Sequence, residues 1–189
     1  IPGKQVSIAI DFASTQYFDG ENYYIQQKRK SFNSKDYVDV ISEIVNNQPI
    51  ISIEDPFAED DWSSWNRFME KAPANLQVIG DDLFTTNAAR LARGVADKSA
   101  NAILIKPNQN GLVTFTESVL KMAESEGFRT IVSARSGETE DSWLADIATG
   151  WRAGQIKVGS THGGERTAKW NRLLELEASE KTTFARPFN

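Results

Sequence analysis

The stretch Pro49-Ile50-Ile51-Ser52-Ile53-Glu54 decides the fold, because it is a short apolar run that stops on a carboxylate. Short isoleucine-rich runs of this kind are typical of buried strands. A helical pattern follows over 60–72, and a second apolar run, Leu76-Gln77-Val78-Ile79-Gly80, ends at Asp81. A strand, a helix and a second strand in this order predict two parallel strands joined by a crossover.

The same unit recurs along the chain. Apolar runs occupy 5–10, 49–53, 76–80, 102–105, 129–132 and 154–156, and helical patterns occupy 35–46, 60–72, 86–97, 114–125, 140–151 and 165–179. We therefore expect a single α/β domain over 1–189, with parallel strands whose C-termini share one face. A closed barrel needs eight units and about 250 residues. Six units predict an incomplete (β/α)-barrel whose other two units lie on residues absent from this chain. An open sheet is the alternative, although it would expose two edges.

The segment between the first strand and the first helix carries turn signals. Asp19-Gly20 lies between aromatic runs, which predicts a hairpin. The basic segment 28–35 is expected to be an exposed loop, and Ser34 is expected to cap the helix that follows.

Composition narrows the function. The 189 residues fit one domain, and a net charge of −5 argues against nucleic acid or an anionic membrane as a partner. The absence of cysteine excludes disulfides and thiolate metal sites, and no apolar run is long enough to predict a membrane span. Because Ile1-Pro2-Gly3-Lys4 resembles neither a signal peptide nor a natural start, we expect a fragment, a processed chain or a trimmed one.

Three acids follow three of the predicted strands. Asp11, Glu54 and Asp81 each come directly after an apolar run. Because the C-termini of parallel strands meet at one face, we expect their carboxylates to converge. Hard oxygen ligands suit Mg²⁺, so the three acids predict a magnesium site. The alternative is that each acid only caps a helix or faces solvent.

Basic residues end the other three strands. Lys106 and Lys157 follow the fourth and sixth strands, and Arg135-Ser136-Gly137 follows the fifth. Where the strand C-termini meet and water is largely excluded, nearby cations disfavour the charged ammonium form of a lysine. Its neutral amine can then act as a base. A guanidinium and a hydroxyl suit a phosphate or carboxylate. The alternative is that each lysine pairs with a neighbouring carboxylate. His162, in a glycine-rich run, is interpreted as a solvated bystander.

Several motifs together resemble the enolase family. They are Ser52-Ile53-Glu54-Asp55-Pro56-Phe57, Gly80-Asp81-Asp82-Leu83, Leu104-Ile105-Lys106-Pro107-Asn108-Gln109, Ser136-Gly137-Glu138-Thr139-Glu140-Asp141, Gly154-Gln155-Ile156-Lys157 and Glu165-Arg166-Thr167-Ala168-Lys169-Trp170-Asn171. They cover nearly the whole chain in the family's order.

The resemblance implies a cytoplasmic glycolytic lyase that interconverts 2-phosphoglycerate and phosphoenolpyruvate with Mg²⁺. By this resemblance Asp11, Glu54 and Asp81 hold the metal, and Lys106 removes the proton α to the substrate carboxylate. Lys157 holds that carboxylate, while Arg135 and Ser136 contact the phosphate. The family's N-terminal domain and first two barrel strands are missing, so the chain is expected to be inactive alone. It is expected to need its missing part, a complementing fragment or self-association.

Three positions depart from the family pattern, with Ala134, Pro107 and His162-Gly163-Gly164 in place of the usual histidine, valine and Ser-Arg-Ser. Two alternatives stay open, and Ala134 and His162-Gly163-Gly164 favour the first of them. One is a related enzyme that acts on another phosphorylated or phosphonylated enol. The other is a non-catalytic protein-binding module, which retention of all three acids and both lysines disfavours.

Overall fold

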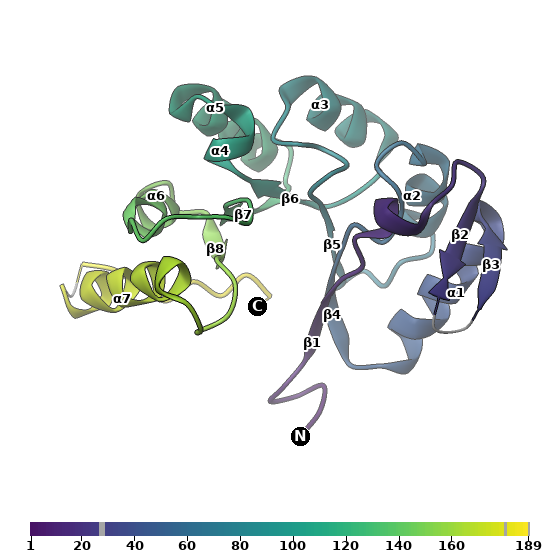
Figure 1. The fold of residues 1–189 in the computed structure, drawn as a ribbon, viewed down its shortest axis with the longest axis horizontal. Helices are drawn as coiled ribbons and strands as arrows, with labels where there is room; N and C mark the ends of the chain where they lie inside the picture. Colours follow the sequence, from purple (N-terminus) through teal and green to yellow (C-terminus); the bar gives the residue numbers. More distant parts are fainter. Residues whose placement is uncertain (27–28, 180, 189) are drawn as a thin grey trace. The chain divides into compact units, whose positions relative to one another are not determined.

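The computed structural model describes residues 1–26, 29–179 and 181–188. They form two compact units, Ile1–Phe84 with Ala92–Asn101 and Thr85–Leu91 with Ala102–Asn189. In each unit parallel strands alternate with helices, as predicted for an α/β chain (Figure 1).

The first unit is built on three parallel strands in the order β1-β4-β5. Their bounds are β1 (Ile8–Asp11), β4 (Ile50–Glu54) and β5 (Gln77–Gly80). β5 is buried at every position and β4 at all but one, which explains why both read as continuous apolar runs rather than as an alternation. The pairing aligns Asp11 with Glu54 and Glu54 with Ile79, so the strands end at the same level.

Two amphipathic helices complete the core of this unit, α1 (Ser34–Asn47) and α2 (Trp62–Met69). The N-cap of α1 is Asn33 rather than Ser34, because the Asn33 side chain accepts a hydrogen bond from the Asp36 amide at 2.9 Å. Asp61 caps α2 in the same way. The largest fully buried side chains of the unit include Tyr23, Tyr37, Phe57, Trp65, Phe68 and Phe84.

A two-stranded antiparallel hairpin precedes α1, formed by β2 (Asn22–Ile25) and β3 (Lys30–Asn33) after the short helix η1 (Ser14–Tyr17). The prediction of a loop over 28–35 was therefore wrong from residue 30 onward; positions 27 and 28 lie outside the described residues. A turn does form at Asp19-Gly20, where the Asp19 carboxylate accepts the amides of Glu21 and Asn22. The basic segment forms β3 because its backbone can hydrogen-bond to that of β2.

The second unit contains three further parallel strands in the order β6-β7-β8. They are β6 (Ala102–Ile105), β7 (Arg129–Ser133) and β8 (Gly154–Lys157). Its helices are α4 (Pro107–Asn110), α5 (Val113–Ser125), α6 (Trp143–Gly150) and α7 (Gly164–Ala178), while α3 (Ala88–Asp97) begins in this unit and continues into the first. α5 packs on β6 and β7, and α6 on β7, β8 and α7.

All six predicted parallel strands are thus present within the described ranges, each shifted by no more than a few residues. Among the helices in those ranges, none is long and apolar enough to cross a membrane.

Candidate functional site

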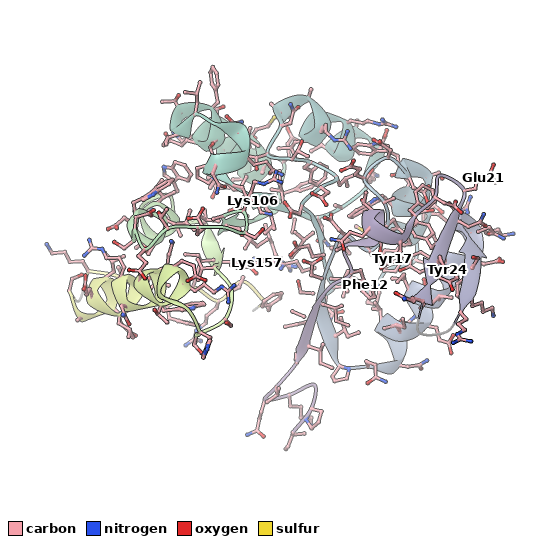
Figure 2. All side chains as sticks on the ribbon, viewed as in Figure 1. Phe12, Tyr17, Glu21, Tyr24, Lys106 and Lys157 are labelled. Carbon is pink, nitrogen blue, oxygen red and sulfur yellow. The ribbon has the colours of Figure 1, made fainter. Side chains whose placement is uncertain are left out.

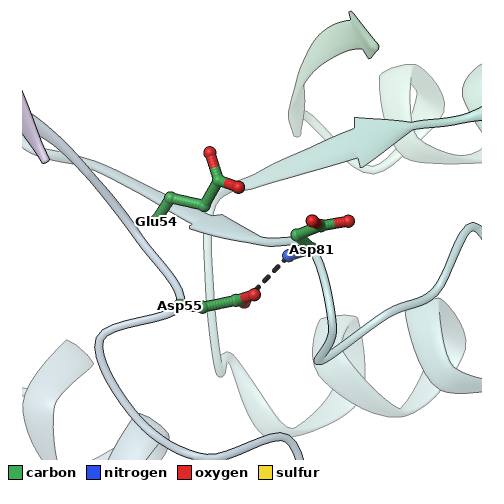
Figure 3. A group of neighbouring side chains, drawn as sticks. All are labelled: Glu54, Asp55 and Asp81. Atoms are coloured by element: carbon green, nitrogen blue, oxygen red, sulfur yellow. Dashed lines mark hydrogen bonds between the residues drawn. The ribbon is translucent and has the colours of Figure 1, made fainter. Parts of the chain in front are cut away.

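Three buried carboxylates gather at the ends of β4 and β5 (Figure 3). Glu54 is the last residue of β4, Asp55 follows it, and Asp81 follows β5. Each offers an oxygen within 4.8 Å of the others, and the residues are only 5%, 3% and 9% exposed. We call these three residues the acid cluster.

Asp55 is the member of the acid cluster that sequence reasoning did not assign. Its backbone adopts a left-handed φ of 39°, and its amide donates to the Ile79 carbonyl at 3.0 Å. Its two carboxylate oxygens accept the amides of Asp81 and Asp82, each at 2.9 Å. Burial raises the pKa of Asp55 to about 8, while the same two amides act to lower it. Asp55 therefore fixes the turn that carries Asp81.

Asp11 lies beside Glu54 in the strand register. Its side chain is exposed, and its Oδ1 accepts the Ala13 amide at 3.0 Å. Ala13 has a left-handed φ of 46°, so this hydrogen bond stabilises an unusual turn. The close group of three acids accordingly contains Asp55 where the sequence placed Asp11. The role of Asp11 as a ligand stays a prediction.

The acid cluster suits a divalent cation. Ionised carboxylates that share a site repel one another, and burial removes the water that would offset this repulsion. A hard divalent cation bound by oxygen ligands supplies the compensating charge. Glu54 and Asp81 offer such oxygens at one point of the fold.

The turn after β5 is held by a buried ring. Phe84 is completely buried, and a Cβ added to Gly80 would lie 2.5 Å from its ring. A Cβ added to Gly94 would lie 2.3 Å from the same ring. Glycine at both positions therefore lets the ring pack directly on the backbone next to Asp81.

Lys106 follows β6 in the second unit and is 9% exposed. Its amide donates to the Thr86 hydroxyl at 3.0 Å, and that hydroxyl donates to Gln109 Oε1, also at 3.0 Å. Lys106 is the N-cap of α4, and Pro107 is its first residue. Proline is favoured there because the amide of the first helical residue has no partner within the helix. The position of Pro107 at the start of α4 therefore explains why proline is tolerated where the family usually has valine.

Lys157 ends β8, at the same level of the strands as Lys106. The register pairs Ile105 with Val132 and Ser133 with Lys157, so one row crosses the ends of β6, β7 and β8. The Ser133 hydroxyl donates to the Lys157 carbonyl at 2.8 Å. Figure 2 shows both lysines among the side chains of this unit.

Arg135 and Ser136 lie in the exposed loop after β7, Arg135–Asp141, which we call the 135–141 loop. The Arg135 amide donates to Asn108 Oδ1 at 3.2 Å, and Asn108 Nδ2 donates to Glu138 Oε1 at 2.7 Å. The loop also contacts the buried Lys169 of α7, whose ammonium donates to the Thr139 carbonyl at 2.6 Å. Sequence reasoning assigned neither Asn108 nor Lys169 a role.

Gly164, the first residue of α7, lies against the Glu140 side chain. A Cβ at Gly164 would overlap Glu140 Oε1, so the end of this flexible side chain occupies the space a Cβ would need. His162 is exposed, and its carbonyl accepts a hydrogen bond from Arg166 at 3.2 Å.

The predicted residues fall into two sets, one in each unit. Asp11, Glu54 and Asp81 belong to the first unit, and Lys106, Arg135, Ser136 and Lys157 to the second. Within each unit the residues stand at, or directly after, the C-terminal ends of parallel strands.

Comparison with known proteins shows the family of this chain. Residues 2–186 match the family model described as "Enolase, C-terminal TIM barrel domain". A curated protein named Enolase, from Natranaerobius thermophilus, is 43% identical over 175 residues, which is 93% of this chain. The chain spans 41% of the length of that relative. With six of a barrel's eight strand–helix units in its described ranges, the chain belongs to the enolase family and carries an incomplete C-terminal TIM-barrel domain.

Proposed function

We propose that the protein carrying this chain is an enolase-type lyase that interconverts 2-phosphoglycerate and phosphoenolpyruvate in the cytoplasm. The observation that supports the proposal most directly is the acid cluster at the strand ends of a chain in this family. Buried carboxylates are costly to the fold unless they are neutralised, hydrogen-bonded or bound to a cation, and a cation meets this need for several carboxylates at once.

Asp11, Glu54 and Asp81 would hold Mg²⁺, with Asp55 fixing the Asp81 turn. The bound ion supplies positive charge that stabilises the substrate carboxylate as negative charge builds up on it. Glu54 and Asp81 are buried on strand ends, so their rotamers are confined by packing before any ligand binds.

Lys106 would accept the α-proton on Nζ in its neutral form, and Lys157 would hold the substrate carboxylate. Both side chains come from rigid strand ends, which keeps a base in position better than a loop does. Arg135 would bind the phosphate through two guanidinium hydrogen bonds, and Ser136 would add a hydroxyl donor.

The 189-residue chain alone is proposed to be inactive. Six strand–helix units leave the edges of an eight-unit barrel uncovered, and the chain covers less than half of its relative. Activity would then require the rest of the polypeptide, a complementing fragment or self-association to cover those edges.

The deciding experiment is phosphoenolpyruvate formation from 2-phosphoglycerate by the full polypeptide that carries this chain, with Mg²⁺ and after chelation. We expect turnover that chelation abolishes. A folded full polypeptide without turnover would overturn the proposed function, whereas turnover by the 189-residue chain as a monomer would overturn only its proposed dependence on a further segment.

A second candidate is a related lyase that acts on another phosphorylated or phosphonylated enol. The observation that favours it is the carboxylate of Glu140, a residue of the 135–141 loop, which fills the space over Gly164. Ala134, next to Arg135, stands where the family usually has a histidine, so this region lacks that polar side chain. If the full polypeptide turned over a phosphonate analogue faster than 2-phosphoglycerate, this candidate would replace the first.

A further inference from the structure

Lys169 is a buried cation that the proposed reaction does not use. It lies in the middle of α7 and is 1% exposed, among the largest fully buried side chains of the described residues. Its ammonium donates to the Thr139 carbonyl at 2.6 Å and lies 3.5 Å from Glu138 Oε2. A lysine is rarely buried unless its charge is compensated, so this position requires its partners on the 135–141 loop.

A chain of polar contacts continues from Lys169 toward Arg135. Glu138 bridges Lys169 and Asn108, accepting the Asn108 amide nitrogen at 2.7 Å. Asn108 in turn accepts the Arg135 backbone amide on its Oδ1 at 3.2 Å. Chemistry fixes the orientation of the Asn108 amide, because a carboxylate can only accept and a backbone N–H can only donate.

These contacts connect three elements. Lys169 belongs to α7, Asn108 to the first turn after Lys106, and Glu138 to the 135–141 loop. Arg135 and Ser136 are exposed, and their side chains gain no position from burial. The main chain at Arg135 is instead held through Asn108, which stands two residues after Lys106.

We propose that Lys169, Glu138 and Asn108 are positioning residues that hold the 135–141 loop in its phosphate-binding form. This inference rests on the proposed function of Arg135 and Ser136. Lys169 anchors the loop from the interior, Glu138 transmits the anchor, and Asn108 sets the Arg135 main chain relative to the Lys106 turn. The three residues do not touch the substrate; they act through the loop.

The loss of the anchor should raise KM more than it lowers kcat. The phosphate-binding contacts are made equally in the ground state and in the transition state. Displacing the 135–141 loop therefore weakens the binding of both states to the same extent, which raises KM and leaves kcat unchanged. The Lys106 amide keeps its hydrogen bond to Thr86 in such a variant. Proton abstraction by Lys106 from the bound substrate should therefore be little affected.

The first arm of the test measures kinetics in the full polypeptide. In Lys169→Met, KM for 2-phosphoglycerate should rise roughly tenfold, in line with the loss of one or two buried hydrogen bonds, while kcat stays within about threefold. Lys121→Met is the matched control, because Lys121 forms only an exposed ion pair with Glu117 on α5. An unchanged KM in Lys169→Met would overturn the proposal.

A swap of chemical groups separates positioning from general stability. Asn108→Asp sets two carboxylates against each other and should raise KM about threefold to tenfold, since one hydrogen bond is lost. The double variant Asn108→Asp/Glu138→Gln restores one donor between the same two positions, so its rise in KM should be smaller than the product of the two single-variant rises. The single variant Glu138→Gln accounts for the charge lost beside Lys169. Effects of the two substitutions that simply multiply would count against the relay through Glu138.

The second arm needs no activity and so remains informative if the proposed function fails. Amide hydrogen exchange of residues 134–141 should speed up at least about tenfold in Lys169→Met, because the loop can open more often. It should stay at the wild-type rate in Lys121→Met. Equal exchange in both variants would show that Lys169 does not hold the loop, whatever the enzyme's substrate.

Discussion

The acid cluster of the first unit and the 135–141 loop of the second are positioned by different means. Backbone register brings Glu54 and Asp81 to the same level, and Asp55 locks the turn by accepting two main-chain amides. The main chain of the 135–141 loop is instead held by side chains from α4 and α7, with Asn108 at Arg135 and Lys169 at Thr139.

The difference has a physical basis. The proposed metal site needs carboxylates that stay close in spite of their repulsion, and a buried sheet supplies that constraint. A loop that binds an anion, as proposed for the 135–141 loop, needs access to its ligand; this loop lies exposed and depends on a few contacts at its base. Variants should therefore damage the two regions in different ways.

Replacing Lys106 should give the largest effect. Lys106→Ala in the full polypeptide should slow exchange of the substrate α-proton with solvent deuterium by about 10²–10⁴-fold, because a positioned base is lost. Lys121→Ala, an exposed lysine of α5, is the control. Wild-type exchange in Lys106→Ala would assign the base to another residue.

Substitutions in the acid cluster should weaken the affinity for the metal and leave the Lys106 base in place. Asp81→Asn should weaken Mg²⁺ binding roughly 100-fold, since even outer partners of a metal ligand are worth 10–100-fold. Isothermal titration of the full polypeptide measures this effect. Glu43→Gln, an exposed acid on α1, should leave the affinity unchanged. Equal affinities for both variants would remove Asp81 from the site.

Asp55 tests whether the turn after β5 is set by backbone hydrogen bonds. Asn at this position offers one acceptor and sets an N–H against the other amide, so Asp55→Asn should lower the free energy of unfolding by about 1–3 kcal/mol. Chemical denaturation of the metal-free polypeptide provides the measurement. A variant as stable as Glu43→Gln, an exposed control on α1, would contradict the role given to this turn.

The smallest effect is expected at the surface pair of the second unit. Arg172 hydrogen-bonds Asp146 with its closest contact at 2.7 Å and lowers the pKa of that carboxyl. A lowered pKa means that the pair contributes stability at neutral pH and loses it as pH falls below about 4. Melting temperatures of wild type and Asp146→Asn should differ slightly at pH 7 and converge at pH 3. A difference that grows toward acid would reverse the assigned sign.

Much of the fold could be predicted because apolar runs mark the strands and turn residues mark where they end. The six strands and most helices follow from periodicity and strand-end polar residues. The β3 strand was missed because its residues are polar and basic, and its pairing depends on the long-range partner β2 rather than on its own pattern.

The candidate site was predictable only in part. Glu54 and Asp81 were found because strand ends converge in any parallel sheet. Asp55 was not, since its role depends on a left-handed backbone angle and on two amides across the turn. Lys169 was equally hidden, because a lysine in a helix is read as exposed until the burial is known.

The ring of Phe84 between Gly80 and Gly94 limits the order in which this family member can change. Alanine at either glycine would clash with a completely buried ring, which would have to shift. A smaller side chain at position 84 must therefore come first, and each alanine becomes tolerable only afterwards. The three positions are mutationally coupled, so lineages that have replaced Phe84 should be the ones in which either glycine is lost.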